Sequence, residues 1–453
     1  MSLSPDARGQ WGSKIGFIMA AAGSAVGLGN IWRFPYMVGQ NGGGAFVLVY
    51  LLCVLLVGLP LLWNEVALGR TTGRNPIGAF VSLNRRNWLI APILCLLLCF
   101  IVLSYYSVIA GWTIGYIAKT ISGAEGSFAD FIATPEYVIP LTALFIGMTI
   151  FIVMGGVSGG IEKAAKIMMP LLLLLVIVVA VRSLTLPGAA AGVEYYLKPD
   201  FSKINGSVIM AALGQAFFSL SVGWGLMITY GSYMPKNQSI VSSGTWVAFA
   251  DTFIAFLGGL MVFPAVFAFG FSPEAGPTLV FQTLPAIFEQ MPGGAIVGAL
   301  FFLLLMVAAL TSSISMLEVP VSYLIDEKKW NRKRAAIIIG FLALIVSIPS
   351  ALSQGAHDGL STMTLFGKTS FLDITDFIFG TFCVVLISFL LSTFSGWAIK
   401  TSRMVDEIGE GASVFRRKLF LGLSLATVWV FFIRYVCPIV LAIMIVREIT
   451  NVI

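Results

Sequence analysis

Two apolar segments of this chain are each interrupted by a short, glycine-rich polar stretch. The first comprises residues 23–30 (GSAVGLGN) and the second comprises residues 219–225 (SLSVGWG). Inside a bilayer every backbone N–H and C=O group needs a partner, so a helix is broken at membrane depth only where the freed groups meet an ion, a ligand or a water-filled cavity. The pair of stretches is typical of a secondary transporter and marks a candidate binding site.

The surrounding composition excludes a soluble globular protein. Hydrophobic residues make up 58% of the chain and charged residues 11%, and apolar runs long enough to cross a bilayer recur from end to end. The sequence therefore predicts an all-α polytopic membrane protein with about eleven spans. These spans are expected near residues 14–37, 43–69, 88–118, 137–154, 163–181, 204–233, 240–270, 294–324, 335–352, 373–399 and 418–446.

The distribution of basic residues predicts the orientation of the chain. With the N-terminus placed in the cytoplasm, most of the 27 Lys and Arg residues fall in inner loops, as the positive-inside rule requires. The C-terminus is then expected outside. The longer outer loops lie near 119–136, 182–203, 271–293 and 353–372. All five cysteines lie in predicted spans without metal-type spacing, which indicates packing residues rather than disulfides or a zinc site.

The two interruptions fall in the first helix of each of two five-helix repeats. Because five is odd, the second repeat is inverted relative to the first, an arrangement typical of transporters that bind at the midplane. The predicted division is a cytoplasmic N-terminal gate segment at 1–13, helices 1–5 at 14–181, helices 6–10 at 204–400 and helix 11 at 418–448.

The backbone groups exposed at the two interruptions suit an amino acid bound together with cations. A half-helix beginning inside the membrane offers free N–H groups to a carboxylate, and Leu28 and Gly29 are placed to do this. The opposite half-helix ends leave carbonyl groups that suit a hard cation or an ammonium group. These carbonyls belong to Gly23, Ala25, Val26, Phe218 and Ser219.

Polar residues in other spans add candidate ligands. Thr311, Ser312 and Ser313 interrupt an apolar run, and their hydroxyls either bind an ion or bond to the preceding helical turn. Asp251 lies in the middle of an apolar span, which makes it a functional candidate. Glu65, Glu318 and Arg434 are also placed within spans, and for Glu318 an ion pair is favoured over a proton relay. No metal cluster, nucleophile elbow or phosphate loop appears, so an enzyme is not expected.

Several motifs resemble the neurotransmitter:sodium symporter family, whose members have the LeuT fold. These are AVGLGNIWRFPY at 25–36, NGGGAF at 41–46, QAFFSLS at 215–221, ITYGSY at 228–233 and LTSS at 310–313. The resemblance runs from Gln10 to helix 11. It implies a LeuT fold of 5+5 inverted repeats plus one further helix, discontinuous helices 1 and 6, and sodium-coupled symport of a small molecule.

The resemblance implies two sodium sites, built from different sets of residues. The first uses Ala25, Asn30, Ser219 and Asp251 together with the substrate carboxylate. The second uses Gly23, Val26, Ala308, Thr311 and Ser312. Family members commonly have Asn where Asp251 aligns. A fixed carboxylate beside the ion supplies the charge that chloride supplies in many animal relatives, so transport without chloride is expected, although Tyr50, Gln215 and Ser219 still match chloride-site positions.

The resemblance also implies gates on both sides. An outer gate pairs Arg33 with Asp376, Asp373 being the less well aligned choice. An inner gate pairs Arg8 with Asp326 and is supported by Trp11 and Tyr233. Gly160 and Pro170 in helix 5 match a motif whose local unwinding hydrates the second sodium site.

The expected substrate is a small amino acid, glycine or alanine first. Monoamine carriers place an aspartate where this chain has Gly27, so its absence favours a substrate that brings its own carboxylate, and bulky Trp224 favours a small pocket. The full set of expected substrate-binding residues is Ala25, Gly27, Leu28, Gly29, Val102, Tyr106, Phe218, Ser219, Ser221, Trp224, Ser312 and Met316. Leucine, an aromatic amino acid, taurine or another ω-amino acid remain alternatives.

The resulting prediction is a sodium-coupled symporter that works by alternating access, with two Na⁺ ions per cycle. A sodium-linked amino-acid receptor and a channel are the rival classes, and a channel is disfavoured because no pore-loop filter or charged ring is present. Short tails and eleven spans predict a multi-pass protein of a prokaryotic cytoplasmic membrane. It is expected to be a monomer or a weak dimer that binds no nucleic acid.

Overall fold

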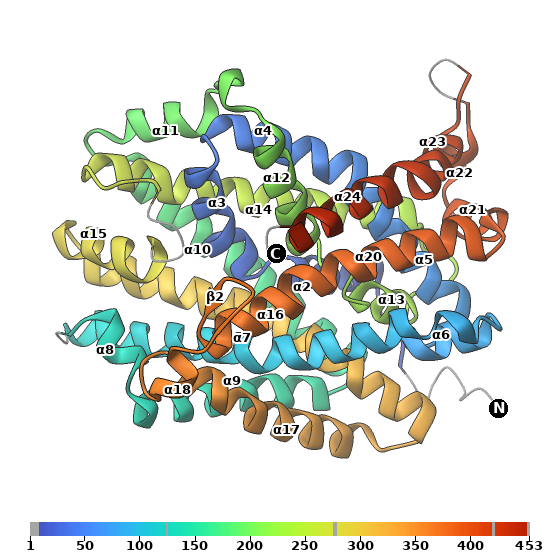
Figure 1. Ribbon diagram of the computed structural model, residues 1–453, viewed down its shortest axis with the longest axis horizontal. Helices are drawn as coiled ribbons and strands as arrows, with labels where there is room; N and C mark the ends of the chain where they lie inside the picture. Colours follow the sequence, from blue (N-terminus) through green and yellow to red (C-terminus); the bar gives the residue numbers. More distant parts are fainter. Residues whose placement is uncertain (1–8, 124–125, 275–278, 419–421, 451–453) are drawn as a thin grey trace.

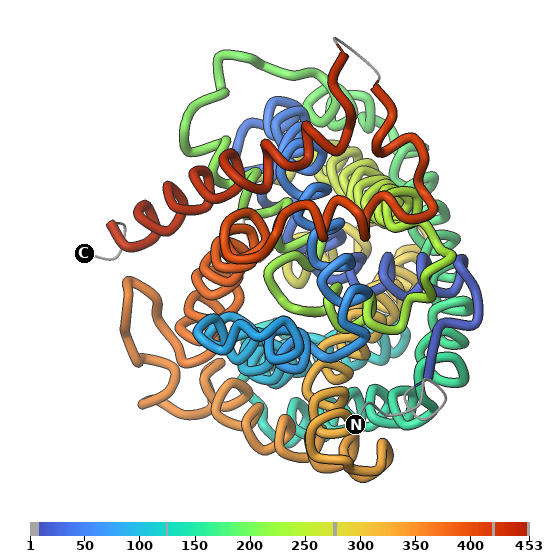
Figure 2. Tube along the Cα trace, turned by 90° about the vertical axis from the view of Figure 1, so that its right-hand side faces the viewer, coloured from blue at the N-terminus to red at the C-terminus, as the bar shows by residue number. Residues whose placement is uncertain are grey.

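The computed structural model describes residues 9–123, 126–274, 279–418 and 422–450. Long helices run side by side through the molecule (Figure 1), and end-on the chain forms a closed bundle in which the segment joining α12 to α13 lies near the centre (Figure 2). Within the described residues, nine continuous helices are long and apolar enough to cross a membrane. A tenth span is a bent helix pair, and a shorter apolar helix, Gly206–Ser219, begins the sixth span.

The first five spans contain one broken helix, the first, and several π-helical turns. The elements of this half are α2 (Lys14–Ala25), η1 (Gly29–Arg33), α3 (Phe34–Gln40), α4 (Gly44–Cys53), η2 (Val54–Gly58), α5 (Leu59–Thr72), α6 (Pro76–Ser82), η3 (Arg86–Trp88), α7 (Ile90–Ser122), α8 (Phe128–Ile132), α9 (Pro135–Met154), η4 (Val157–Glu162), α10 (Lys163–Leu184), α11 (Ala189–Leu197) and η5 (Phe201–Lys203).

The remaining spans follow the same pattern. Their elements are α12 (Gly206–Ser219), α13 (Leu226–Gly231), α14 (Ile240–Ala268), η6 (Leu279–Thr283), α15 (Leu284–Gln290), α16 (Gly294–Lys328), α17 (Arg332–Leu352), α18 (Asp358–Ser361), β1 (Thr364–Leu365), β2 (Lys368–Thr369), α19 (Phe371–Thr375), η7 (Asp376–Cys383), α20 (Val384–Thr393), η8 (Phe394–Ala398), α21 (Thr401–Gly409), α22 (Ser413–Arg416), α23 (Leu425–Phe431), η9 (Phe432–Val436) and α24 (Cys437–Thr450).

The two ends of the bundle differ as the loop predictions require. The short elements of the four predicted outer loops, α8, α11, α15 and the hairpin of β1 and β2, gather at one end, whereas α6, α21 and α22 lie at the other (Figure 1). In the antiparallel hairpin Thr364 is paired with Thr369.

The last span begins later than its hydropathy indicates. The sequence predicts a start at residue 418, but the helix begins at Leu425 because the side chain of Ser424 caps it by accepting the N–H of Thr427. An N-cap of this type fixes the first turn of a helix. Residues 1–8 of the predicted gate segment, Arg8 included, lie outside the described residues.

Candidate functional site

The first helix is broken where the sequence predicts. The α2 helix ends at Ala25, Val26 adopts an extended conformation (φ −74°, ψ 105°), and the chain turns by 51° before the second half continues from Gly29 to Gln40. The break leaves carbonyl groups at the end of α2 and N–H groups at Leu28 and Gly29 without a full helical ladder. Both kinds of group therefore need partners outside their own helix.

The sixth helix is interrupted next to the break in the first helix. Between α12 and α13 the chain adopts left-handed conformations at Ser221 (φ 53°), Gly223 (φ 83°) and Gly225 (φ 74°). For Ser221 this conformation is costly, and such strain concentrates at functional sites. Its hydroxyl donates to the carbonyl of Ser24 in the first break (3.0 Å), and Glu65 accepts the N–H of Gly223 (2.6 Å). The two breaks thus contact each other directly.

The residues expected at the first sodium site lie together. The side-chain amide of Asn30 donates to the Asp251 carboxylate (2.7 Å) and to the Ser219 hydroxyl (3.1 Å), and Ser219 donates to the other Asp251 oxygen (2.8 Å). Tyr50 lies beside this cluster, with its hydroxyl 3.3 Å from that of Ser219. All four side chains are buried. The cluster offers one carboxylate and several neutral oxygens, which suits a hard cation.

The residues expected at the second sodium site also converge. The Thr311 and Ser312 hydroxyls lie 3.3 Å and 3.4 Å from the Val26 carbonyl oxygen, and 2.8 Å and 3.4 Å from that of Ala308. Gly23 packs closely against Thr311, since a Cβ atom built on Gly23 would lie 3.2 Å from the Thr311 Cβ. The oxygen-rich ends of α2 and the middle of α16 are therefore neighbours, and every group in this set is uncharged.

A cavity of about 230 Å³ lies immediately beyond the breaks. Five of the expected substrate residues line it: Leu28, Gly29, Val102, Tyr106 and Phe218. Tyr106 accepts the N–H of Leu28 (3.2 Å). The rest of the cavity lining includes six aromatic residues: Trp32, Tyr36, Tyr105, Trp112, Phe128 and Phe281.

The other expected substrate residues lie deeper than this cavity. Ser221, Trp224, Ser312 and Met316 are buried and do not line it. Trp224 packs edge-on against Phe218, with ring centroids 5.8 Å apart, and its carbonyl accepts the thiol of Cys99. A side chain added at Gly27 would collide with the Ser312 hydroxyl. The space at the breaks is thus filled by the protein's own side chains.

The two residues of the expected outer gate are not paired in the described part of this structure. Arg33 and Asp376 both line the cavity but do not form an ion pair with each other within the described chain. The guanidinium carbon of Arg33 lies 4.6 Å from the Phe218 ring centroid, while Asp376 accepts the hydroxyl of Tyr105 (2.8 Å). Asp373 lines the same cavity and accepts the Ser370 hydroxyl.

The expected inner gate is closed around Trp11. The indole N–H of Trp11 donates to the Tyr230 carbonyl (2.9 Å), its backbone N–H donates to the Tyr233 carbonyl, and its ring contacts both tyrosines edge-on. Asp326 accepts the backbone and side-chain N–H groups of Asn75, both at 3.0 Å. A cavity thus lies on the Arg33 side of the breaks, whereas packed side chains fill the Trp11 side.

Two charged residues near Trp11 have partners that the sequence does not identify. Glu318 forms the ion pair favoured for it, since Arg332 donates to both of its oxygens (2.7 and 3.0 Å), and it also accepts the Tyr233 hydroxyl. Glu162 accepts the Gly12 N–H (2.6 Å) and the Ser13 hydroxyl, which ties the N-terminal segment to helix 5. Their partners lie on other elements, so no local pattern identifies them.

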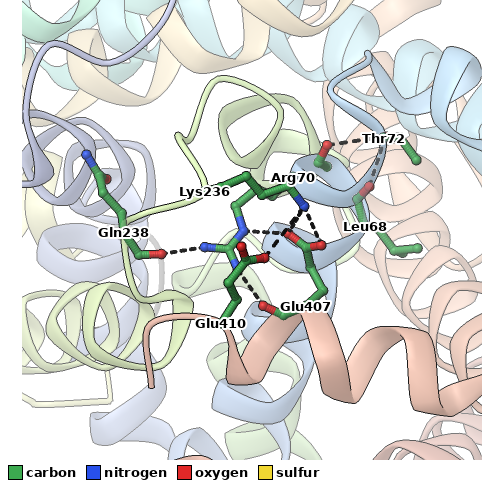
Figure 3. Close-up of polar contacts among 8 residues, drawn as sticks. Leu68, Arg70, Thr72, Lys236, Gln238, Glu407 and Glu410 are labelled. Atoms are coloured by element: carbon green, nitrogen blue, oxygen red, sulfur yellow. Dashed lines mark hydrogen bonds and ion pairs between the residues drawn. The ribbon is translucent and has the colours of Figure 1, made fainter. Parts of the chain in front are cut away.

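A further cluster, centred on buried Arg70 and Glu407, joins three segments at the end of the bundle that holds α21 (Figure 3). Arg70 at the end of α5 pairs with Glu407 of α21 (2.6 Å) and also donates to the carbonyls of Glu407 and Gln238. Lys236 binds both oxygens of Glu407 and lies 3.9 Å from Glu410. We call these residues the Arg70 cluster. It fastens the amphipathic helix α21 to α5 and to the segment after α13.

The local unwinding of helix 5 that is expected between Gly160 and Pro170 is not present in this structure. Gly160 lies buried within the π-helical η4, and Pro170 lies inside the continuous α10 helix. The N–H that proline lacks leaves one backbone bond missing there. The expected unwinding remains a prediction for another conformation.

Comparison with known proteins places the chain among sodium-dependent transporters. The model of the sodium:neurotransmitter symporter family matches residues 8–125 and 136–452. The chain is 42% identical to the uncharacterized sodium-dependent transporter YhdH of Bacillus subtilis, over 96% of both chains. It is 32% identical to the uncharacterized sodium-dependent transporter MJ1319 of Methanocaldococcus jannaschii, over 98% of this chain and 91% of that one. The crystal structure of MhsT in complex with L-phenylalanine matches with a TM-score of 0.87 and 41% identity, over 97% of this chain and all of that one.

Proposed function

Since the chain belongs to the sodium:neurotransmitter symporter family, we propose that it imports a hydrophobic amino acid by coupling its movement to that of sodium ions. Family membership makes it a sodium-dependent, multi-pass membrane transporter rather than an enzyme, and the predicted LeuT-type fold with a broken first helix is confirmed. The proposal rests chiefly on one observation. The two helix breaks contact each other beside the buried cluster of Asn30, Ser219 and Asp251.

A larger substrate than glycine or alanine is supported by two findings. The similar protein MhsT was crystallised with L-phenylalanine, and the cavity beyond the breaks is lined mostly by apolar and aromatic side chains. Trp224, from which a small pocket is expected, does not line that cavity but packs beneath Phe218. These findings favour the alternative of a larger neutral or aromatic amino acid.

Recognition of the amino-acid backbone is proposed to use the first break and Tyr106. The N–H groups of Leu28 and Gly29 suit the carboxylate, and the Tyr106 hydroxyl, 3.2 Å from the Leu28 nitrogen, reaches the same place. The substrate amine then faces carbonyls at the ends of α2 and α12. Binding of sodium and substrate draws Arg33 toward Asp376 and shifts the population toward an inward-open state.

The ion requirements follow from the two oxygen clusters. We propose that Asn30, Ser219, Asp251 and the Ala25 carbonyl hold one Na⁺, and that Thr311, Ser312 and the carbonyls of Gly23, Val26 and Ala308 hold another. Asp251 already supplies a negative charge beside the first ion, so chloride is not needed. A prokaryotic cytoplasmic membrane is the proposed location, because the relatives include bacterial and archaeal proteins.

The test is uptake of radiolabelled phenylalanine into proteoliposomes. We expect accumulation under an inward sodium gradient, none when potassium replaces sodium, and no loss when chloride is replaced. Unlabelled leucine and tryptophan should compete better than glycine, alanine or taurine. Better competition by glycine or alanine would restore the small substrate, and sodium-dependent binding without accumulation would indicate a receptor.

A matched pair of variants on α7 separates substrate recognition from general damage. Tyr106→Phe removes the hydroxyl beside Leu28 and should lower phenylalanine uptake about tenfold, the effect of one lost hydrogen bond to a charged group. Tyr116→Phe removes a hydroxyl from the same helix outside this cavity and should leave uptake unchanged. Equal effects of the two changes would contradict the proposed carboxylate site.

A further inference from the structure

We propose that Arg434, Trp397 and Tyr435 form a binding site for the phosphate headgroup of an anionic phospholipid in the cytoplasmic leaflet. Arg434 lies in a membrane span, and neither sodium nor substrate recognition uses it. A charged side chain within a span is costly unless it is paired, so its partner has to be identified.

The three side chains form a compact cradle. The guanidinium carbon of Arg434 lies 4.3 Å from the ring centroid of Trp397 and 5.8 Å from that of Tyr435. The two rings meet edge-on at 5.6 Å, and the indole N–H of Trp397 donates to the Arg434 carbonyl (2.9 Å). Aromatic rings stabilise one face of the cation, while its two terminal nitrogens make no hydrogen bond with another described residue.

No acidic side chain among the described residues pairs with this arginine. Among the residues that the structure describes, no carboxylate lies within 4.0 Å of Arg434, and its Nε atom is buried without a hydrogen-bond partner. The arginines of the inner end are different, since Arg70 pairs with Glu407 and Arg332 pairs with Glu318. Arg434 is therefore a cation whose counter-charge is not supplied by the described part of the chain.

The local backbone is built to hold Arg434 in this place. Two π-helical turns, η8 and η9, abut each other here, and such turns are frequent at functional sites. They approach closely at Gly396, where a Cβ atom would lie 3.0 Å from the Cα of Arg434. The absence of a side chain at Gly396 lets the Arg434 backbone pack against η8 and brings its side chain over Trp397.

The depth and exposure of the cradle point to a lipid. Trp397 is one residue before the end of helix 10 at Ala398, and exposed Lys400 and Arg403 follow directly, as is typical of the cytoplasmic surface. Trp397 and Tyr435 are 54% and 43% exposed on the outside of the bundle, so in a membrane they face lipid at headgroup level. The planar guanidinium group donates two parallel hydrogen bonds to phosphate oxygens, and anionic lipids supply such groups to cations at this surface.

The test measures retention of phosphatidylglycerol by the purified full-length protein in nanodiscs of neutral lipid doped with it. Native mass spectrometry compares the wild type with Arg434→Gln. We expect the change to weaken phosphatidylglycerol retention about tenfold, because one charge-assisted pair is lost. Arg403→Gln removes an exposed cation from α21 outside the cradle and serves as the matched control, with retention within twofold of the wild type.

Two further measurements separate binding of a lipid from binding of free phosphate and from contact with a second copy of the chain. If Arg434→Gln does not fold, Arg434→Lys and Trp397→Phe should give intermediate losses, since each keeps only part of the cradle. Equal protection of the wild type against heat by inorganic phosphate and by phosphatidylglycerol would indicate a site for free phosphate and overturn the lipid assignment. Light scattering that shows a dimer, lost on Arg434→Gln, would assign the face to a second copy instead.

Discussion

Replacement of Glu407 by Gln should destabilise the transporter far more than any other neutralisation on α21. The change removes the carboxylate that pairs with Arg70 and Lys236 but keeps the side-chain shape. Arg70 is only 3% exposed, so water does not replace the lost charge. Removing one partner of a buried ion pair costs about 3–5 kcal/mol, because the other charge stays buried without compensation.

This free energy converts into a measurable change in melting temperature. Globular proteins gain roughly 2 cal/mol/K of entropy per residue on unfolding, so a chain of 453 residues loses about 3–5 °C for this cost. A thiol-reactive dye reports the transition, because all five cysteines are buried and react only when the chain opens. The protein is heated in detergent with the dye, and the apparent midpoint is compared with that of the wild type.

The matched control lies one residue away. Asp406→Asn breaks the ion pair with Arg416. The side chain of Asp406 is 70% exposed and that of Arg416 is 55% exposed. Exposed pairs contribute about 0–1 kcal/mol, so the midpoint should move by about 1 °C or less. Equal shifts for Glu407→Gln and Asp406→Asn would refute the argument from burial. A double replacement of Arg70 by Met and Glu407 by Leu should recover most of the loss, because it leaves no buried charge.

Three other predictions concern the ions, the first break and the inner gate. Asp251→Asn should raise the sodium concentration for half-maximal uptake at least about tenfold and make uptake respond to chloride, because a charge beside the ion is lost; an unchanged sodium response would contradict this. Gly27→Ala should abolish uptake, because its Cβ has no space, whereas Gly206→Ala, with nothing within 4 Å, should have no effect; uptake assays on both variants check this. Arg332→Gln should lower the melting midpoint by several degrees, because its buried carboxylate partner Glu318 loses its cation. Arg334→Gln, which removes a cation stacked on Trp330, should not lower it.

Local patterns were sufficient to predict the spans and the two breaks. Glycine and polar residues stand out against apolar surroundings, so the interruptions at residues 23–30 and 219–225 are visible in the sequence. The left-handed conformation of Ser221 is not, because that residue type rarely adopts it and only the packing of helix 6 against helix 1 holds it there.

Long-range pairing explains most of what the sequence did not reveal. Arg70 and Glu407 are 337 residues apart, and each alone resembles an ordinary residue of a cytoplasmic end. The position of the cavity depends in the same way on how Phe218 and Trp224 pack, which composition does not determine. The expected sodium-site residues lie together in the structure, and their ion binding remains a prediction. The division into two inverted repeats also remains a prediction.

The π-helical turns in several spans have a consequence for how related sequences differ in length. Each such turn holds about one residue more than a normal turn, and an α-helix advances about 100° per residue. Deleting a residue within η2 or η9 restores a regular helix on both sides without moving either end far, whereas the same deletion in α7 rotates every later side chain away from its neighbours. Single-residue gaps between homologues should therefore collect at these turns, inside the membrane, and not only in loops.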